Sequence, residues 1–281
     1  MKAAMWNWKA AGSICRAGSK LIKNESVGMK PYILAENNWK EIKEQKIDMV
    51  VLPWGATEAH NYHLPYGTDN YQVEAIAERA AGIAWEAGAR PVVLPVVPFG
   101  VNTGQPDILL DMNLNPSTQL LILRDLITVL NRQGIRKLMV LNGHGGNNFK
   151  PLLRELGLEF PDMFLSLCNW FSVGDRDKHF KEPGDHADEM ETSVMLHLKP
   201  EFVRPLEEAG SGAAKESVIT GIRSGWAWSE RKWSQVTEDT GVGNPEHATV
   251  EKGEAYVSEV AQRVGQLLIE ICQMDMENMY L

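Results

Sequence analysis

Cysteine and long apolar runs are scarce in this chain. Its 281 residues include three cysteines, Cys15, Cys168 and Cys272, and no Cys-x-x-Cys pair. Such sparse and widely spaced thiols favour neither a disulfide framework nor a thiolate metal site. The longest apolar runs, 47–54 and 91–100, are far shorter than the roughly 20 residues that a membrane-spanning helix needs. The sequence therefore predicts no membrane partner.

Basic residues are also in the minority. The chain has 37 Asp and Glu against 28 Lys and Arg, a formal net charge of −9 at pH 7. This balance disfavours a nucleic-acid partner, because phosphate backbones bind basic surfaces. Residues 1–23 scatter five basic side chains among apolar ones, unlike the unbroken apolar run of a secretory signal. We therefore expect a cytoplasmic protein.

Apolar runs alternate with helix-like segments, which is typical of βαβ units around a mostly parallel sheet. We expect buried strands at 48–53, 90–98, 137–141 and 163–168. Helices are expected at 70–87, 117–133, 149–159, 185–198 and 250–274. The pattern predicts an α/β fold.

No internal repeat or low-complexity linker divides the chain, so we expect a single domain over 29–281. A second Met at position 29 precedes the first predicted element, and residues 1–28 are expected to be an N-terminal extension outside the core. The segment 206–244 is long and rich in Gly, Ser and Trp, which is typical of a lid or a binding loop. Its tryptophans can also pack in a core or a subunit interface, which we expect for at least one of Trp226, Trp228 and Trp233.

Candidate site residues begin directly after the first predicted strand. Glu58 and His60 occupy alternate positions, so in extended backbone both side chains point to the same side. A carboxylate and an imidazole placed in this way can share a metal ion. Asp69 lies just before the next predicted helix, where N-capping is the simpler interpretation of a carboxylate.

The third predicted strand ends in a glycine-rich turn, Asn-Gly-His144-Gly-Gly-Asn-Asn. Glycine lets the backbone turn sharply and approach a ligand closely. Sites in open α/β sheets form at the carboxyl ends of the strands, so His144 is expected near Glu58 and His60. The turn has neither the Lys-Ser/Thr of a P-loop nor the Gly-x-Gly-x-x-Gly order of dinucleotide folds, which disfavours phosphate binding.

A further cluster, residues 186–191, opens the predicted helix 185–198. Asp188 and Glu189 are explained by the preference of helix N-termini for acidic side chains. Glu191 lies beside an apolar stripe, and a carboxylate near a core needs a cation or a hydrogen-bond partner. Among the other histidines, His63 could line the same site.

Four motifs, in this order, resemble those of the creatininase family. They are 52–69, which contains Glu58, His60 and Asp69; the turn 142–147; His-Ala-x-Glu-x-Glu-Thr-Ser at 186–193; and a C-terminal motif at 241–253. The resemblance extends over roughly residues 30–270. It implies a three-layer α/β/α fold with a mostly parallel central sheet.

The resemblance also implies a divalent metal centre with two ions per chain. It carries the role of metal ligand to Glu58, His60, Asp69, His144 and Glu191, with Asp69 bridging the two ions. Creatininase itself has a Glu two residues beyond the motif His, where this chain has Gly146, so Glu191 is expected to supply that carboxylate. Zn²⁺ is the first expectation, and Mn²⁺ and Fe²⁺ are alternatives.

The implied activity is that of a metal-dependent amidohydrolase. A metal-activated water would attack the C–N amide bond of a cyclic amide, a formamide or a related small molecule. His186 would protonate the leaving nitrogen, and Glu191 would take part in catalysis as well as in metal binding. Strict creatinine hydrolysis is not expected, because of Gly146 and because the segment before His186 lacks the substrate-gating tryptophans of creatininase.

Three alternatives stay open at this point. The chain can be a formamide deformylase, a small peptide hydrolase of the same family, or a catalytically inactive binding protein that a metal stabilises. The resemblance further implies a homo-oligomer, such as a hexamer, to which the apolar segment 225–233 could contribute.

Overall fold

The computed structural model describes residues 29–281, and its centre is a parallel four-stranded sheet. The strands lie in the order β2-β1-β3-β4. Their bounds are β1 (Met49–Trp54), β2 (Pro91–Val93), β3 (Lys137–Asn142) and β4 (Phe164–Asn169). The predicted α/β class and parallel sheet are confirmed. The extension predicted for 1–28 lies outside the described residues.

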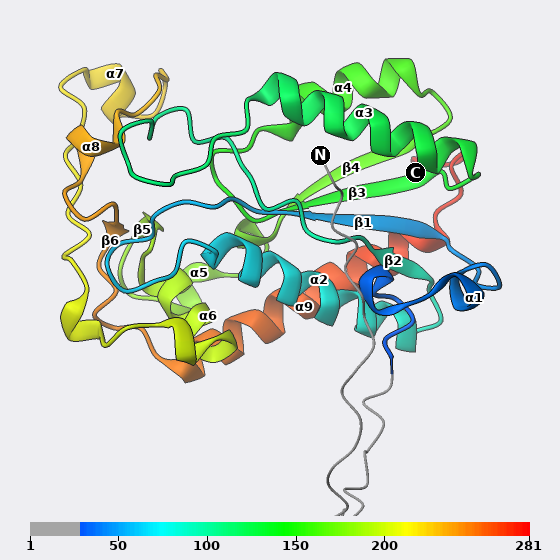
Figure 1. The fold of residues 1–281 in the computed structure, drawn as a ribbon, viewed down its shortest axis with the longest axis horizontal. Coiled ribbons are helices and arrows are strands. Elements are labelled where there is room, and N and C mark those ends of the chain that lie inside the picture. The colour runs from blue at the N-terminus through cyan, green and yellow to red at the C-terminus, as the bar shows by residue number, and fades with distance from the viewer. Residues whose placement is uncertain (1–28) are drawn as a thin grey trace, which may run out of the picture.

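Helices cover both faces of the sheet and give the fold three layers (Figure 1). One layer consists of α2 (Thr68–Glu86), α6 (Glu189–Leu198) and α9 (Val250–Gln273). The other layer consists of α3 (Pro116–Arg132) and α4 (Phe149–Glu159). Because both faces of the sheet are buried, its strands have nearly continuous apolar sequences rather than alternating ones.

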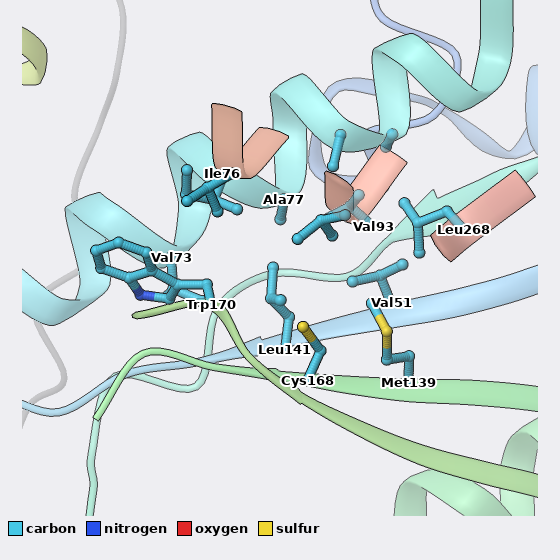
Figure 2. Packing of buried hydrophobic residues seen from close by; sticks show 14 of the residues in the cluster. Val51, Val73, Ile76, Ala77, Val93, Met139, Leu141, Cys168, Trp170 and Leu268 are labelled. Atoms are coloured by element: carbon cyan, nitrogen blue, oxygen red, sulfur yellow. The ribbon is translucent and has the colours of Figure 1, made fainter. Parts of the chain in front are cut away.

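The core between the sheet and α2 is built mainly from aliphatic side chains (Figure 2). Val51 of β1 and Leu141 of β3 belong to the same buried cluster as Val73 and Ile76 of α2. The next residues along each strand, such as Leu52, point to the opposite face and join the cluster under α3 and α4. The sheet is thus fixed from both sides.

The order of the strands places a crevice at one edge of the sheet. β1 leads through α2 to β2 on one side, and β2 leads through α3 to β3 on the other side of β1. In open α/β sheets, ligands bind beyond the carboxyl ends of the two strands between which the order reverses. Those strands are β1 and β3, and the segments that follow them carry Glu58, His60 and His144.

Short elements gather beyond this edge (Figure 1). They are α5 (Arg176–His179), an antiparallel pair of β5 (Gly184–His186) and β6 (Val242–Gly243), α7 (Thr220–Arg223) and α8 (Trp233–Val236). The remaining short helices are Leu34–Glu36, α1 (Trp39–Ile42), Trp170–Ser172, Pro200–Phe202 and Leu206–Glu208. Within residues 29–281, no helix is both long and apolar enough to cross a membrane.

Two predicted elements differ from the structure. The strand expected at 90–98 ends at Val93, because Pro95 and Pro98 have no N–H to donate and only an isolated bridge joins Val97 to β1. The helix expected at 185–198 begins at Glu189 instead, since the Asp188 carboxylate caps it. Residues 184–186 form β5.

The three tryptophans of the segment 206–244 differ in burial. Trp233 is buried, as expected for at least one of them, whereas the side chains of Trp226 and Trp228 are largely exposed.

Candidate metal centre

Glu58 and His60 lie in the loop that follows β1, and both are buried. The Nε2 of Gln105 donates a hydrogen bond to Glu58 Oε2 (2.7 Å), which leaves Oε1 2.8 Å from His144 Nδ1. The Nδ1 of His60 donates to the backbone carbonyl of Glu58 (3.1 Å). Because a carbonyl only accepts, His60 Nδ1 carries the hydrogen and Nε2 is the nitrogen that faces Asp69.

Asp69 lies inside the first turn of α2, whose N-cap position is Gly67. Its carboxylate points into the site, with Oδ1 3.1 Å from His60 Nε2 and Oδ2 3.0 Å from His144 Nδ1. The simple N-cap interpretation of Asp69 is therefore wrong, and the carboxylate is placed between two histidines.

The turn after β3 fixes His144. The Asn142 side chain accepts from the His144 N–H (3.2 Å) and donates to its carbonyl (2.9 Å). The ring Nε2 of His144 donates to the Val101 carbonyl (3.0 Å), so the lone pair of the neutral ring is on Nδ1, toward the carboxylates.

Gly146 lies directly against this hydrogen bond. A Cβ at position 146 would be 2.4 Å from His144 Nε2 and 2.4 Å from the Val101 carbonyl oxygen. A side chain there is incompatible with the present position of the imidazole. This is a physical reason for glycine at position 146.

Glu191 reaches the same cluster from α6. Its Oε2 accepts from the Ala187 N–H (2.5 Å) and lies 3.9 Å from His60 Nε2. Gln72 of α2 donates to the Glu191 backbone carbonyl (3.1 Å), which ties the two helices together at this point. The contact places the carboxylate on the His60 side of Asp69.

Glu58, His60 and His186 form one group of three candidate ligands, and two further groups of three share Asp69. One of these two is Glu58, Asp69 and His144, and the other is His60, Asp69 and Glu191; in each group the candidate ligand atoms all lie within 4.8 Å of one another. The structure thus brings together all five residues predicted as metal ligands. A mixed set of carboxylates and imidazoles suits Zn²⁺, Mn²⁺ or Fe²⁺.

The carboxylates of Glu58, Asp69 and Glu191 form ion pairs with histidines, and no Lys or Arg of residues 29–281 pairs with them. Burial disfavours the charged form of His60, but Asp69, with help from Glu191 and Glu58, outweighs it and raises the pKa of His60 to about 10. In the same way, burial opposes the charge on His144, but Glu58 and Asp69 raise its pKa well above the ordinary value. The buried negative charge thus needs a cation, which protons on the two imidazoles supply when no metal is bound.

The two Glu carboxyl groups respond differently to the same burial. Burial disfavours the ionised form of Glu58, yet His144 and His186 hold its pKa well below the usual range. Burial raises the pKa of Glu191 to about 8, although His60 opposes this effect.

His186 lies on β5, and its ring centroid is 4.2 Å from that of His60. Its Nε2 donates to the Ala59 carbonyl (2.8 Å), and Nδ1 is 3.8 Å from Glu58 Oε1. Burial, together with the nearby His60, lowers the pKa of His186 and favours its neutral form. His63, the other candidate, instead makes a hydrogen bond to Thr192 (2.8 Å).

A cavity of about 100 Å³ borders Glu58, His144 and His186. Its wall also contains Gln105, Arg231 and Trp233, which the sequence did not indicate. The ring of Trp233 stands edge-on to that of His186, with 5.3 Å between centroids. A tryptophan therefore contacts His186, but it comes from the segment 206–244 and not from the residues just before His186. The composition of 206–244 was the only sequence signal for Arg231 and Trp233, and no sequence signal indicated Gln105.

The chain matches the model of the Creatininase family, described as creatinine amidohydrolase, over residues 35–268. It is 30% identical over 179 residues to a 3-dehydro-scyllo-inosose hydrolase of Thermotoga maritima, a match that covers 58% of this chain and 55% of the relative. It is 29% identical over 222 residues to a mycofactocin precursor peptide peptidase of Mycolicibacterium smegmatis, covering 76% of this chain and 81% of the relative. A creatinine amidohydrolase of Pseudomonas putida is 27% identical over 198 residues, covering 62% and 74%.

Solved structures agree with these matches. A Bacteroides fragilis protein described as a candidate creatinine amidohydrolase superposes with a TM-score of 0.84 at 44% identity, covering 88% of this chain and 98% of the other. A manganese form of creatininase superposes with a TM-score of 0.71 at 22% identity, covering 87% and 100%, and shares the fold. A Zn-Zn form of a mutant creatininase gives the same values.

Proposed function

The chain belongs to the creatininase family of amidohydrolases, and on that premise we propose that it cleaves the C–N bond of an amide at a centre of two divalent metal ions. The observation that carries the proposal is the position of Asp69, whose two carboxylate oxygens each face a different group of candidate ligands. A carboxylate shared in this way is what a bridged pair of ions requires.

The chain's own hydrogen bonds support this ligand set. Backbone carbonyls fix the tautomers of His60 and His144, so that one ring nitrogen of each faces the carboxylates. Gln105 holds Glu58 in place, and the Ala187 N–H holds Glu191. When bound, divalent ions at such a centre acidify a water molecule and stabilise the negative charge that develops on a carbonyl oxygen.

His186 is the group that we propose to protonate the leaving nitrogen. Its Nε2 hydrogen is committed to Ala59, so proton exchange takes place at Nδ1, and the side chain lines the cavity. Its lowered pKa keeps the ring neutral near pH 7, so Nδ1 can accept a proton from the attacking water and pass it on. Glu191, with a pKa raised to about 8, is the second candidate for holding that proton.

The metal and the assembly are finer parts of the same proposal. We propose Zn²⁺ first, with Mn²⁺ or Fe²⁺ as alternatives, since the donor atoms suit all three. We also propose a homo-oligomer, whose contacts would cover exposed apolar side chains such as Trp226 and Trp228. Analytical ultracentrifugation at micromolar concentration tests the assembly, and a monomer would contradict it.

The relatives differ in substrate: by name, one acts on an inosose, one on a peptide and one on creatinine. The metal centre alone therefore does not fix the substrate, and among amides it leaves cyclic amides, formamides and short peptides open.

The test is turnover of a panel of these three classes by protein reconstituted with Zn²⁺, Mn²⁺ or Fe²⁺. We expect hydrolysis of at least one class, reduced about 100-fold or more in His186→Asn, because a general acid typically contributes that much. His197→Asn is the matched control, since its ring contacts Arg79 and lines a different cavity. Metal binding without turnover of any class would favour the inactive binding protein instead.

A further inference from the structure

Glu230, Arg231 and Trp233 line one side of the cavity at the candidate metal centre, and hydrogen bonds join this segment to the loop after β2. The Trp233 N–H donates to the Gly104 carbonyl (3.0 Å), and Thr103 Oγ1 donates to Glu230 Oε2 (2.9 Å). The backbones are in close contact, since a Cβ on Gly104 would be 2.3 Å from the Arg231 carbonyl oxygen. Arg231 is therefore held at a defined place beside the cavity.

His186, Trp233 and Arg231 lie in a row that leads away from the candidate metal centre. The ring of Trp233 stands edge-on to His186, and the guanidinium carbon of Arg231 lies 4.3 Å from the centroid of the Trp233 ring. One indole thus separates Arg231 from the proposed proton donor. Arg231 is the only Lys or Arg among the residues that line this cavity.

The guanidinium already binds a carboxylate. Arg231 Nη1 lies 3.0 Å from Asp185 Oδ2 and 3.3 Å from Oδ1. Both side chains are about half exposed, at 46% and 56%. An ion pair this exposed contributes little stability, so another carboxylate can replace Asp185 at small cost.

A second cavity, of about 780 Å³, meets the first at Asp185, Glu230 and Arg231. Four of its seven charged lining residues are basic, in a chain with a net charge of −9. Two of the four, Lys215 and Lys232, form no ion pair with any described residue. Lys215 and Lys232 therefore favour an anionic ligand in the second cavity, beside Arg231.

We propose that the substrate amide carries a carboxylate, which Arg231 binds in place of Asp185 while the amide lies at the metal centre. The inference rests on the proposed function, because it concerns the substrate of that same site. It predicts a specificity for acyl amino acids, peptides or other amides with a free carboxylate over neutral amides of the same size.

The test is calorimetric binding of paired hydroxamates, which chelate metal ions, to Zn²⁺-reconstituted protein. Each pair has the same chain length, and one member has a carboxylate where the other has a methyl group: succinate monohydroxamate against butyrohydroxamate, followed by the pairs that are one and two methylenes longer. At one or more lengths, the carboxylate member should bind about tenfold tighter, as a charge-assisted hydrogen bond implies.

Variants separate this contact from general electrostatics. Arg231→Gln should abolish the preference by weakening the binding of the carboxylate member, whereas Asp185→Asn should increase the preference. Arg263→Gln removes the same charge from α9, where Arg263 pairs with Glu259, and should leave the preference intact. A wild type with no preference at any length, or a preference that survives in Arg231→Gln, would overturn the inference. Failure of both members to bind would instead overturn the metal centre itself.

Discussion

A methyl group at position 146 should disable the candidate metal centre without unfolding the protein. In Gly146→Ala, the new Cβ would be 2.4 Å from both His144 Nε2 and the Val101 oxygen, whereas ordinary contact begins at 3.4 Å. The imidazole must therefore move by about 1 Å or lose its hydrogen bond to Val101. Loss of the partner that orients a metal ligand typically costs about 10- to 100-fold in metal affinity, or roughly 1.4 to 2.7 kcal/mol.

Gly145 offers a matched control one residue away. A Cβ on Gly145 would meet nothing within 4 Å, so Gly145→Ala should keep wild-type affinity. Competition with a chromophoric chelator measures the affinity of both variants, and thermal unfolding of the metal-free proteins checks that both fold. Equal affinity of Gly146→Ala and wild type would refute the idea that the His144–Val101 contact orients a ligand.

Three more predictions follow from the same geometry. Glu191→Gln should lose about one of two bound metal ions, because the variant keeps the Glu58, Asp69 and His144 group intact; elemental analysis that still finds two would contradict the assignment. Metal-free protein should lose stability as pH rises from about 6.5 to 10. Protonated His60 stabilises the folded state fully at a pH below 6.5, its pKa in the unfolded chain, and this contribution is lost as the pH passes through about 10, its pKa in the folded protein. Urea unfolding in EDTA measures this, and a flat profile would count against it. Gly253→Ala should destabilise the fold by about 3 kcal/mol or more, because its Cβ would be 1.9 Å from the Ser193 carbonyl where α9 packs on α6. Gly157→Ala is the control on α4: its Cβ would meet nothing within 4 Å, and it should stabilise the fold by about 0.5 kcal/mol. Equal urea midpoints for the two variants would be the contrary result.

The central strands were predictable because burial on both faces gives them continuous apolar sequences. The observed β1, β3 and β4 lie within one residue of the predicted ends. The strand at 90–98 was predicted too long, since apolar character says nothing about the N–H groups that Pro95 and Pro98 lack. The start of α6 was misplaced because capping by Asp188 depends on the extended backbone before it.

The candidate ligands were accessible from the sequence for a related reason. Glu58, His60 and His144 lie just beyond strand ends, where topology alone predicts that they meet. Arg231 and Trp233 reach the cavity through a long segment without periodicity, and their place depends on contacts with distant residues, such as the hydrogen bond from the Trp233 backbone N–H to the Gly104 carbonyl. No local pattern encodes such contacts.

Elemental analysis of the reconstituted protein beside Asp69→Ala tests the shared metal centre most directly. The account predicts about two divalent ions per chain in the wild type and loss of both in Asp69→Ala, because that carboxylate belongs to both groups of ligands. A wild type that takes up no Zn²⁺, Mn²⁺ or Fe²⁺, or an Asp69→Ala variant that keeps two ions, would contradict it.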